Sequence, residues 1–275
     1  MIPTGSNPQK KAVAVIPARY DSVRLPGKPL LMIGGKPLIV RVAERAAAAK
    51  SISRTIVATD DPRICEVANK AGFDAAITRS DHVSGTDRVA EVAHNLRAGI
   101  IVNLQGDEPL IDPETIDRAV NALVNDPAAQ MATTCEPISD ASEVLNQSVV
   151  KVTMDVNRYA TNFSRSPIPF PNQAVEKHGS IEAALRDPGE SGLLSSFRKH
   201  TGLYAYRREF LLEFASWPQS ESERVASLEQ LRALDRGVKI KVVEAASISI
   251  GVDTMEDLER VREIVAGTHA SGVPA

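Results

Sequence analysis

Residues 12–30 read AVAVIPARYDSVRLPGKPL, and this stretch decides the fold. It joins a short apolar run to a loop rich in proline and basic residues. An apolar run of this kind is typical of a strand covered on both faces of a sheet. The segments that follow alternate amphipathic and β-branched stretches, which indicates right-handed strand–helix–strand crossovers. We therefore expect an α/β fold, Rossmann-like, with a mostly parallel sheet and helices on both faces.

The first half of the chain should contain four strands and four helices. The strands are expected at 12–17, 55–59, 74–78 and 100–104, and the helices at 37–50, 62–71, 87–96 and 113–124. After about Met131 the rhythm changes, and strands at 131–136, 149–155 and 202–207 suggest a smaller mixed-sheet lobe. A helix at 221–234, a strand at 238–243 and a helix at 254–266 should follow. The stretch 162–196, rich in Pro, Ser and Gly, is either a surface loop or a substrate lid or partner-contact arm.

Composition narrows the class of protein. The chain has 275 residues, enough for one domain with a modest lobe, and its net charge of −3 provides no basic surplus for binding nucleic acid or anionic lipid. Cys65 and Cys135 have no metal-ligand spacing and should be buried, reduced thiols. The apolar run at 12–18 contains Pro17 and is too short for a signal peptide or a membrane span, so a cytoplasmic protein is expected. The tail 267–275 should fray.

The loop after the first strand is the strongest functional signal. Arg19, Arg24 and Lys28, with Gly27 beside the lysine, follow a buried strand and precede a helix. Such a loop can present three cations and backbone N–H groups to one small volume, as a triphosphate requires. Three basic residues in a solvated loop are the alternative, but the prolines stiffen this loop. The pattern GxxxxGK[ST] is absent, so this is not a P-loop.

Two acidic residues could hold Mg²⁺. Asp107 follows an apolar strand at the ligand edge of the sheet, and capping of the next helix, its alternative role, is better performed by Asp112. Glu108 beside it could orient the loop. Asp253 ends another apolar run, where it is equally well placed to bind metal or to cap the last helix. Because Mg²⁺ takes only one or two protein carboxylates, this pair would suffice.

A third segment, Thr78–Arg88, also follows a strand. Arg79, Ser84, Gly85 and Thr86 could contact a base, a ribose or a phosphate. The alternative is a helix capped by Ser84 or Thr86 behind a polar loop. His82 has no companion at ligand spacing, so it is not expected to bind metal.

A series of motifs resembles the 3-deoxy-manno-octulosonate cytidylyltransferase family, also called CMP-Kdo synthetases. In order they are IPARYDSVRLPGKPL, ATDD, TRSDHVSGTDR, VNLQGDEP, FSRSPIP, RKHTGLYAYRREFL, SLEQLRAL and GVDTMEDLERV. The resemblance runs from about Ala12 to Glu263. It implies a nucleotide-diphospho-sugar transferase-like fold, a homodimer, and Mg²⁺-dependent synthesis of CMP-Kdo and pyrophosphate from CTP and 3-deoxy-D-manno-octulosonate (Kdo), for lipopolysaccharide synthesis.

The resemblance also assigns roles to residues. It implies one cytidylyltransferase domain over 1–275, with a nucleotide-binding half at about 12–130 and a sugar-binding and dimerisation half at about 131–266. Arg19, Arg24 and Lys28 resemble the triphosphate-binding residues, Asp107 and Asp253 the metal carboxylates, and Arg79 to Thr86 the surroundings of cytosine and ribose. The motifs of the sugar-acid pocket contain Gln105, Arg165, His200, Tyr204, Glu229 and Gln230.

Chemistry makes these sugar-pocket residues suitable for an acidic, hydroxylated sugar. Arg165 could hold a carboxylate in a forked geometry, and the others could hydrogen-bond hydroxyl groups. Without the resemblance, Glu229 and Gln230 would be read as surface residues of a helix. Two alternatives remain open: a cytidylyltransferase for a related acidic sugar, such as amino-Kdo or a sialic acid, and a non-catalytic nucleotide-binding protein of the same fold.

Overall fold

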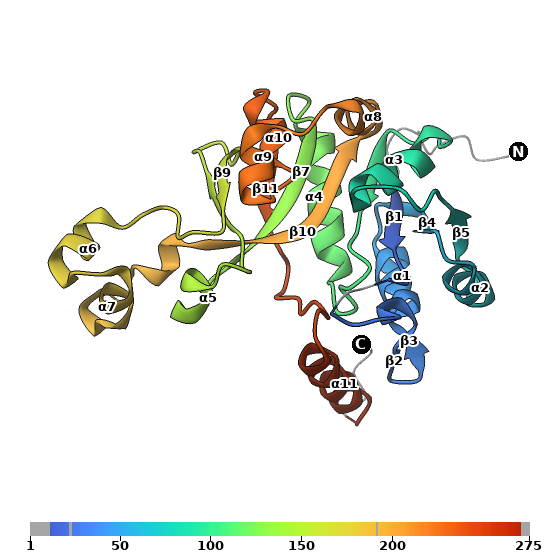
Figure 1. The fold of residues 1–275 in the computed structure, drawn as a ribbon, viewed down its shortest axis with the longest axis horizontal. Helices are drawn as coiled ribbons and strands as arrows, with labels where there is room; N and C mark the ends of the chain where they lie inside the picture. The colour runs from blue at the N-terminus through green and yellow to red at the C-terminus, as the bar shows by residue number, and fades with distance from the viewer. Residues whose placement is uncertain (1–11, 22–23, 191, 271–275) are drawn as a thin grey trace, which may run out of the picture.

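The computed structural model describes residues 12–21, 24–190 and 192–270. Seven strands follow one path across the main sheet, in the order β11-β7-β10-β6-β1-β4-β5 (Figure 1). Their bounds are β1 Ala12–Ala18, β4 Ile52–Thr59, β5 Asp74–Ile77, β6 Ile100–Asn103, β7 Met131–Pro137, β10 Arg198–Arg207 and β11 Ile240–Glu244. The pairs β1–β4, β1–β6, β4–β5 and β7–β11 are parallel, while β10 is antiparallel to both β6 and β7. The expected α/β class with a mixed second half is confirmed.

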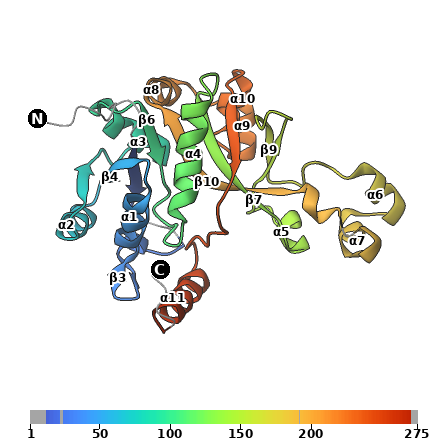
Figure 2. The same cartoon turned by 180° about the vertical axis from the view of Figure 1, so that it is seen from behind.

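Alternation along β1 explains the layers. Val13 and Val15 belong to one buried cluster with α3 (Gly85–His94), whereas Ala14 and Ile16 belong to the other with α1 (Leu38–Ala48). Helix α4 (Pro113–Asn125) lies beside α1 on that second face (Figure 2), with α2 (Pro62–Lys70) alongside α1. The first face is covered by α3 and α8 (Arg208–Ser216). Apolar side chains on both faces of one strand therefore place the loop after β1 between two helical layers.

The remaining elements extend this body. The hairpin β2 (Met32–Ile33) and β3 (Lys36–Pro37) packs against the C-terminal helix α11 (Met255–Ala270), where the Arg262 guanidinium donates to the carbonyl of Met32 at 2.8 Å. Short strands β8 (Lys151–Met154) and β9 (Ala160–Ser164) extend from β10, near α5 (Ala141–Leu145).

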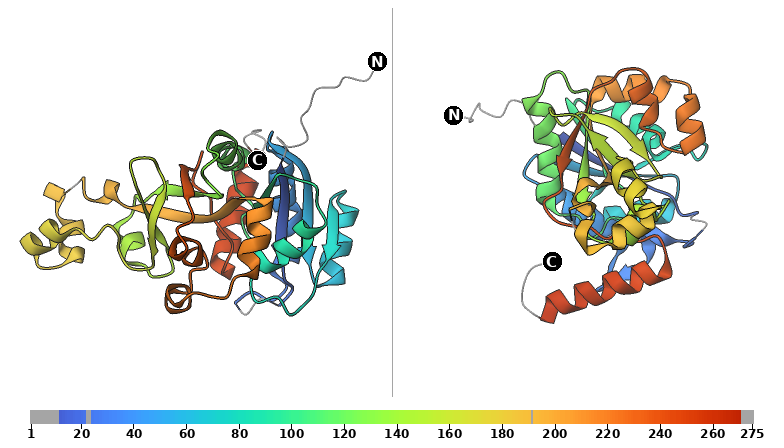
Figure 3. Two further views of the ribbon diagram at one scale, coloured as in Figure 1. Left: turned by 90° about the horizontal axis from the view of Figure 1, so that it is seen from above. Right: turned by 90° about the vertical axis from the view of Figure 1, so that its left-hand side faces the viewer.

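The stretch 162–196 is not a plain surface loop. It contains α6 (Asn172–His178), α7 (Ile181–Arg186) and the short 3-10 turns Pro188–Glu190 and Leu194–Ser196. Figure 3 shows these elements projecting from the sheet as an arm, here defined as residues 165–197. Ile138, Val144 and Phe197 form a small buried cluster at its base, separate from the two main clusters. The arm is therefore a structured extension.

Three expectations need correction. The helix expected at 221–234 is two helices, α9 (Glu221–Ala226) and α10 (Leu231–Asp235), because Ser227 takes a left-handed conformation with φ of 52° and turns Leu228 into the core. The last helix runs past the expected residue 266, since α11 packs Val261 and Val265 into the core and continues to Ala270; fraying of the tail stays a prediction, and residues 271–275 lie outside the described part. Cys135 is buried, but Cys65 is only partly so.

No helix in the described part of the chain is both long and apolar enough to span a bilayer.

Candidate active site

The loop after β1 meets the loop after β6 through one lysine. Gly27, at φ of 69°, begins the short 3-10 turn Lys28–Leu30 and directs the lysine inward. Lys28 Nζ lies 2.8 Å from Asp107 Oδ2 and 3.2 Å from Asp253 Oδ1, and it donates to the carbonyl of Val252 at 2.9 Å. Arg24 adds an ion pair with Asp253 at 3.2 Å. Three segments that are distant in the sequence thus converge at one point.

Asp107 and Asp253 can turn toward the cations because other residues cap the neighbouring helices. Asp112 caps α4 by accepting from the N–H of Glu114 at 2.9 Å. At the last helix, Thr254 and Asp257 exchange hydrogen bonds in a reciprocal cap, and the Asp257 carboxylate also accepts from the N–H of Asp253. The side chain of Asp253 faces Lys28 and Arg24 instead, so Asp253 does not cap the last helix.

The charges of this cluster keep Lys28 protonated. Burial acts to lower the pKa of Lys28, but the carboxylates of Asp107 and Asp253 outweigh it and raise the pKa above its usual value. Among the described residues, no group of three or more His, Cys, Asp or Glu side chains is arranged so that it could hold a metal ion by itself. The carboxylates of Asp107 and Asp253, which face Lys28 and Arg24, nevertheless match the donor set that Mg²⁺ uses when substrate phosphates complete its coordination.

The segment after β5 lies beside the basic loop. The guanidinium of Arg19 donates to the backbone carbonyl of His82, which joins the two segments. Arg79 is exposed and pairs with Asp81 at 3.0 Å. Among the described residues, this arginine is not one of those that contact Lys28, Asp107 or Asp253. Gly85, at the first turn of α3, would place a Cβ 3.4 Å from the ring of Pro17, so the helix start packs closely on β1.

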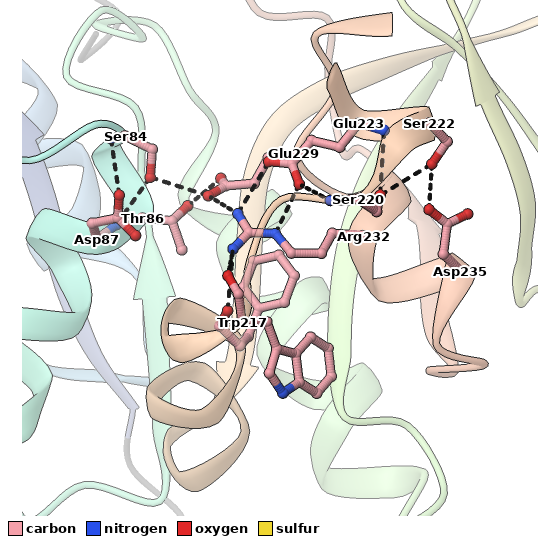
Figure 4. Close-up of polar contacts among 11 residues, drawn as sticks. Ser84, Thr86, Asp87, Trp217, Ser220, Ser222, Glu223, Glu229, Arg232 and Asp235 are labelled. Carbon is pink, nitrogen blue, oxygen red and sulfur yellow. Dashed lines mark hydrogen bonds and ion pairs between the residues drawn. The ribbon is translucent and has the colours of Figure 1, made fainter. Parts of the chain in front are cut away.

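Glu229 connects the two halves of the chain, as Figure 4 shows. Its carboxylate accepts from Ser84 Oγ at 3.0 Å and from Thr86 Oγ1 at 2.6 Å. Ser84 also caps α3, so one serine performs both roles. Arg232 lies 3.2 Å from the same carboxylate and is held in turn by buried Glu223 at 2.9 Å. Burial raises the pKa of Glu229 in spite of these hydrogen bonds and of Arg232.

Glu229 and Gln230 are therefore not surface residues of a continuous helix. They follow the left-handed Ser227 in the turn between α9 and α10, and Gln230 is buried at the start of α10. Arg165 secures this turn: its guanidinium donates to the carbonyls of Ala226, Ser227 and Gln147 at 3.0, 3.3 and 3.1 Å. Its forked donors are used on backbone carbonyls in this structure.

His200 and Tyr204 share one face of β10, with ring centroids 5.3 Å apart. His200 Nε2 hydrogen-bonds Thr133 Oγ1 at 2.8 Å, and Phe163 packs edge-on against the imidazole. Burial lowers the pKa of His200 to about 3, so the ring is neutral, and burial raises the pKa of Tyr204. Gln105 reaches the same strand by donating to the carbonyl of Gly202 at 3.4 Å.

Two further residues make contacts at the site that the sequence analysis did not predict. Burial raises the pKa of Glu108 to about 7, and its carboxyl accepts a hydrogen bond from Ser249. Arg88, fully buried in α3, pairs with Asp60 at 3.0 Å and donates to Thr78, which anchors the segment after β5. The position of Glu108 next to Asp107 could have indicated that Glu108 lies at the site. Nothing in the spacing of Arg88 indicates that its partner is Asp60.

Comparison with known proteins shows the family of the chain. A model of the family described as cytidylyltransferase matches residues 13–240. A 3-deoxy-manno-octulosonate cytidylyltransferase of Syntrophotalea carbinolica is 48% identical over 254 residues, which are 92% of this chain and 98% of the relative. The protein of that name from Escherichia coli is 45% identical over 256 residues, covering 93% and 96% of the two chains.

Solved structures extend the comparison. A CMP:2-keto-3-deoxy-manno-octonic acid synthetase complexed with CTP is 44% identical, with a TM-score of 0.82 over 94% of this chain and 99% of that one. A cytidylyltransferase of Leptospira borgpetersenii, 19% identical with a TM-score of 0.60, shares the fold. With nearly half of the residues identical over almost the full length of both chains, this chain belongs to the 3-deoxy-manno-octulosonate cytidylyltransferase family.

Proposed function

We propose that this chain transfers the cytidylyl group of CTP to Kdo and releases CMP-Kdo and pyrophosphate. The observation that carries the proposal is the convergence of Lys28, Asp107 and Asp253 at the carboxyl edge of the sheet, in a chain of this family. Ligands of open α/β sheets bind at that edge. A triphosphate needs cations, and its metal needs carboxylates; this cluster supplies both.

The two halves divide the substrates. Residues 12–130 bind the nucleotide, with Arg19, Arg24 and Lys28 on the phosphates and the segment Arg79 to Thr86, including Ser84 and Gly85, around cytosine and ribose. Residues 131–266 bind the sugar acid and form a homodimer, with the projecting arm as a structured candidate for the contact. The sugar pocket consists of Gln105, Arg165, His200, Tyr204, Glu229 and Gln230. The expected location is the cytoplasm.

Asp107 and Asp253 are the residues that would hold Mg²⁺. When bound, the ion neutralises phosphate charge and lowers the pKa of a coordinated hydroxyl group. Both carboxylates now contact Lys28, so the lysine must exchange the acids for phosphate oxygens when the nucleotide enters. The raised pKa of Lys28 keeps it charged for that exchange.

The reaction also requires that its two anionic substrates, CTP and Kdo, are aligned. The 2-hydroxyl oxygen of Kdo attacks the α-phosphorus of CTP in line; the new O–P bond forms as the bond to pyrophosphate breaks, and the hydroxyl proton passes to solvent water. Arg19, Arg24 and Lys28 reduce the repulsion between the reactants and stabilise charge on the leaving pyrophosphate. The neutral imidazole of His200 and the phenol of Tyr204 can hydrogen-bond sugar hydroxyls without adding charge.

The direct test is release of pyrophosphate from CTP by purified protein with Mg²⁺. We expect release with Kdo and much less with a sialic acid or without sugar, and much less from ATP, GTP or UTP with Kdo. Faster release with amino-Kdo or a sialic acid would assign the chain to that sugar. Tight binding of CTP without release by any of the three sugars would mean a non-catalytic protein.

A further inference from the structure

The segment that carries Asp253 has no regular secondary structure. This strap, residues 245–253, joins β11 to α11 (Figure 1). Hydrogen bonds fix it to its neighbours: the N–H of Ala246 donates to Thr115 Oγ1 at 2.9 Å, and the N–H of Val252 donates to the carbonyl of Asp107 at 2.8 Å. The position of Asp253 therefore depends on contacts made along the strap.

Ser249 makes the central contact, because it binds the carboxyl groups of two glutamates at once. Its N–H donates to Glu136 Oε1 at 3.0 Å, and its hydroxyl donates to Glu108 Oε2. Glu136 is 2% exposed and pairs with Lys199 of β10 at 3.2 Å. Glu108 directly follows Asp107, and Ser249 precedes Asp253 by four residues, so this serine ties together the two segments that carry the acids.

The strap also approaches Glu108 closely at Gly251. A Cβ at this position would lie 3.3 Å from Glu108 Oε1 and 3.8 Å from the carbonyl oxygen of Asp107. Contact between the strap and Glu108 therefore extends beyond a single hydrogen bond. The fit limits how far the backbone beside Asp253 can shift.

The side chain of Asp253 has a second set of contacts, with Lys28 and Arg24 at 3.2 Å each. These cations are the ones that the proposed function assigns to the triphosphate. Once they turn to phosphate, they no longer hold Asp253 in place. Contacts that do not involve a phosphate-binding residue must then keep the two acids opposite each other.

We propose that Ser249 is a positioning residue that holds Asp253 opposite Asp107 through its hydrogen bonds to Glu108 and Glu136. The proposal rests on the proposed function for the role of the two acids in binding Mg²⁺. Ser249 acts through the strap backbone and touches neither metal nor substrate.

The test measures CTP binding by calorimetry without any sugar, in EDTA and in Mg²⁺. For Ser249→Ala we expect about fivefold weaker binding in Mg²⁺, the effect of one lost hydrogen bond, and unchanged binding in EDTA. Ser249→Thr keeps the hydroxyl and should restore binding. Ser247→Ala is the matched control, since Ser247 Oγ lies on the same strap and donates to Asp112 Oδ2 at 3.3 Å, away from the two acids.

Equal losses in EDTA and Mg²⁺, an equal loss in Ser247→Ala, or no loss in Ser249→Ala would each overturn the proposal. If Ser249→Ala does not fold, Glu108→Leu removes the same hydrogen bond from the other side and should give the same Mg²⁺-specific loss. Pyrophosphate release by the parent chain is a separate readout. A parent that binds CTP more tightly in Mg²⁺ but releases no pyrophosphate with Kdo would contradict the proposed function alone.

Discussion

Lys28 Nζ lies 2.8 Å from Asp107 Oδ2, although 79 residues separate the two in the sequence. A cation expected to bind phosphate and an acid expected to bind metal are thus partners in the free protein. Each neutralises the other until the nucleotide arrives. The predictions below follow from this pair and from the buried groups around it.

Asp107→Asn should leave the fold intact and lower turnover at least ~100-fold, because an amide is a much weaker metal ligand and Lys28 loses its partner. The measurement is the rate of pyrophosphate release at saturating Mg²⁺, CTP and Kdo, with circular dichroism to monitor folding. Asp74→Asn is a matched control, since Asp74 is exposed at the start of β5 and pairs with Arg54 at 2.6 Å. Near-normal turnover would exclude the metal-binding role.

Lys28→Ala should raise the KM for CTP and lower turnover together, because it removes the most buried cation of the basic loop. Steady-state kinetics with CTP as the varied substrate gives both values. Lys36→Ala removes an exposed lysine that pairs with Glu44 at 2.6 Å and should change neither. If turnover and the KM for CTP are both unchanged in Lys28→Ala, the lysine does not serve the phosphates.

Arg165→Ala should raise the KM for Kdo far more than the KM for CTP. The guanidinium holds the carbonyls of Ala226 and Ser227, so its loss frees the turn that carries Glu229 as well as removing a donor for the sugar carboxylate. Arg198→Ala is a useful control, because that side chain donates to the carbonyls of Ser195 and Phe197, which belong to the arm. Equal increases in the two KM values would assign Arg165 to the nucleotide or to general structure.

His200 should make the protein less stable as the pH falls. Its pKa is lowered from 6.5 to about 3 by burial, so the unfolded chain binds a proton below pH 6.5 while the folded chain does not. The free energy of unfolding is therefore not reduced by this histidine above pH 6.5, and it decreases as the pH falls below that value. Between pH 6.5 and pH 5.5 the loss is about 1 kcal/mol.

Urea unfolding at several pH values tests this sign and size. His200→Gln should reduce the pH dependence by that amount, whereas His94→Gln, at the exposed end of α3, should leave it unchanged. A pH dependence in His200→Gln equal to that of the parent would show that the histidine is protonated to the same extent in both states.

The sequence was most informative where periodicity and capping act locally. The apolar run at 12–17 predicted a strand covered on both faces, and Asp112 before Pro113 predicted the start of α4. An arm at 162–196 was one of the alternatives, but its helices were not predicted. The break between α9 and α10 was not predicted, because the left-handed Ser227, with φ of 52°, accompanies the burial of Leu228, a tertiary effect. For the site, strand ends identified Lys28 and Asp107, but spacing left Asp253 undecided. The long-range contacts of Glu229 with Ser84 and of Glu108 with Ser249 have no local signature.

The antiparallel insertion of β10 between β6 and β7 has a consequence for synthesis on the ribosome. Strand β7 emerges more than sixty residues before its neighbour, as the bounds Met131–Pro137 and Arg198–Arg207 show, so it cannot join the nascent sheet when it is made. Until β10 leaves the exit tunnel, the hydrogen-bonding edge of β6 stays open to other chains. The edge of β6 therefore stays exposed to aggregation while the whole arm is translated, and slow decoding of the arm would prolong that exposure.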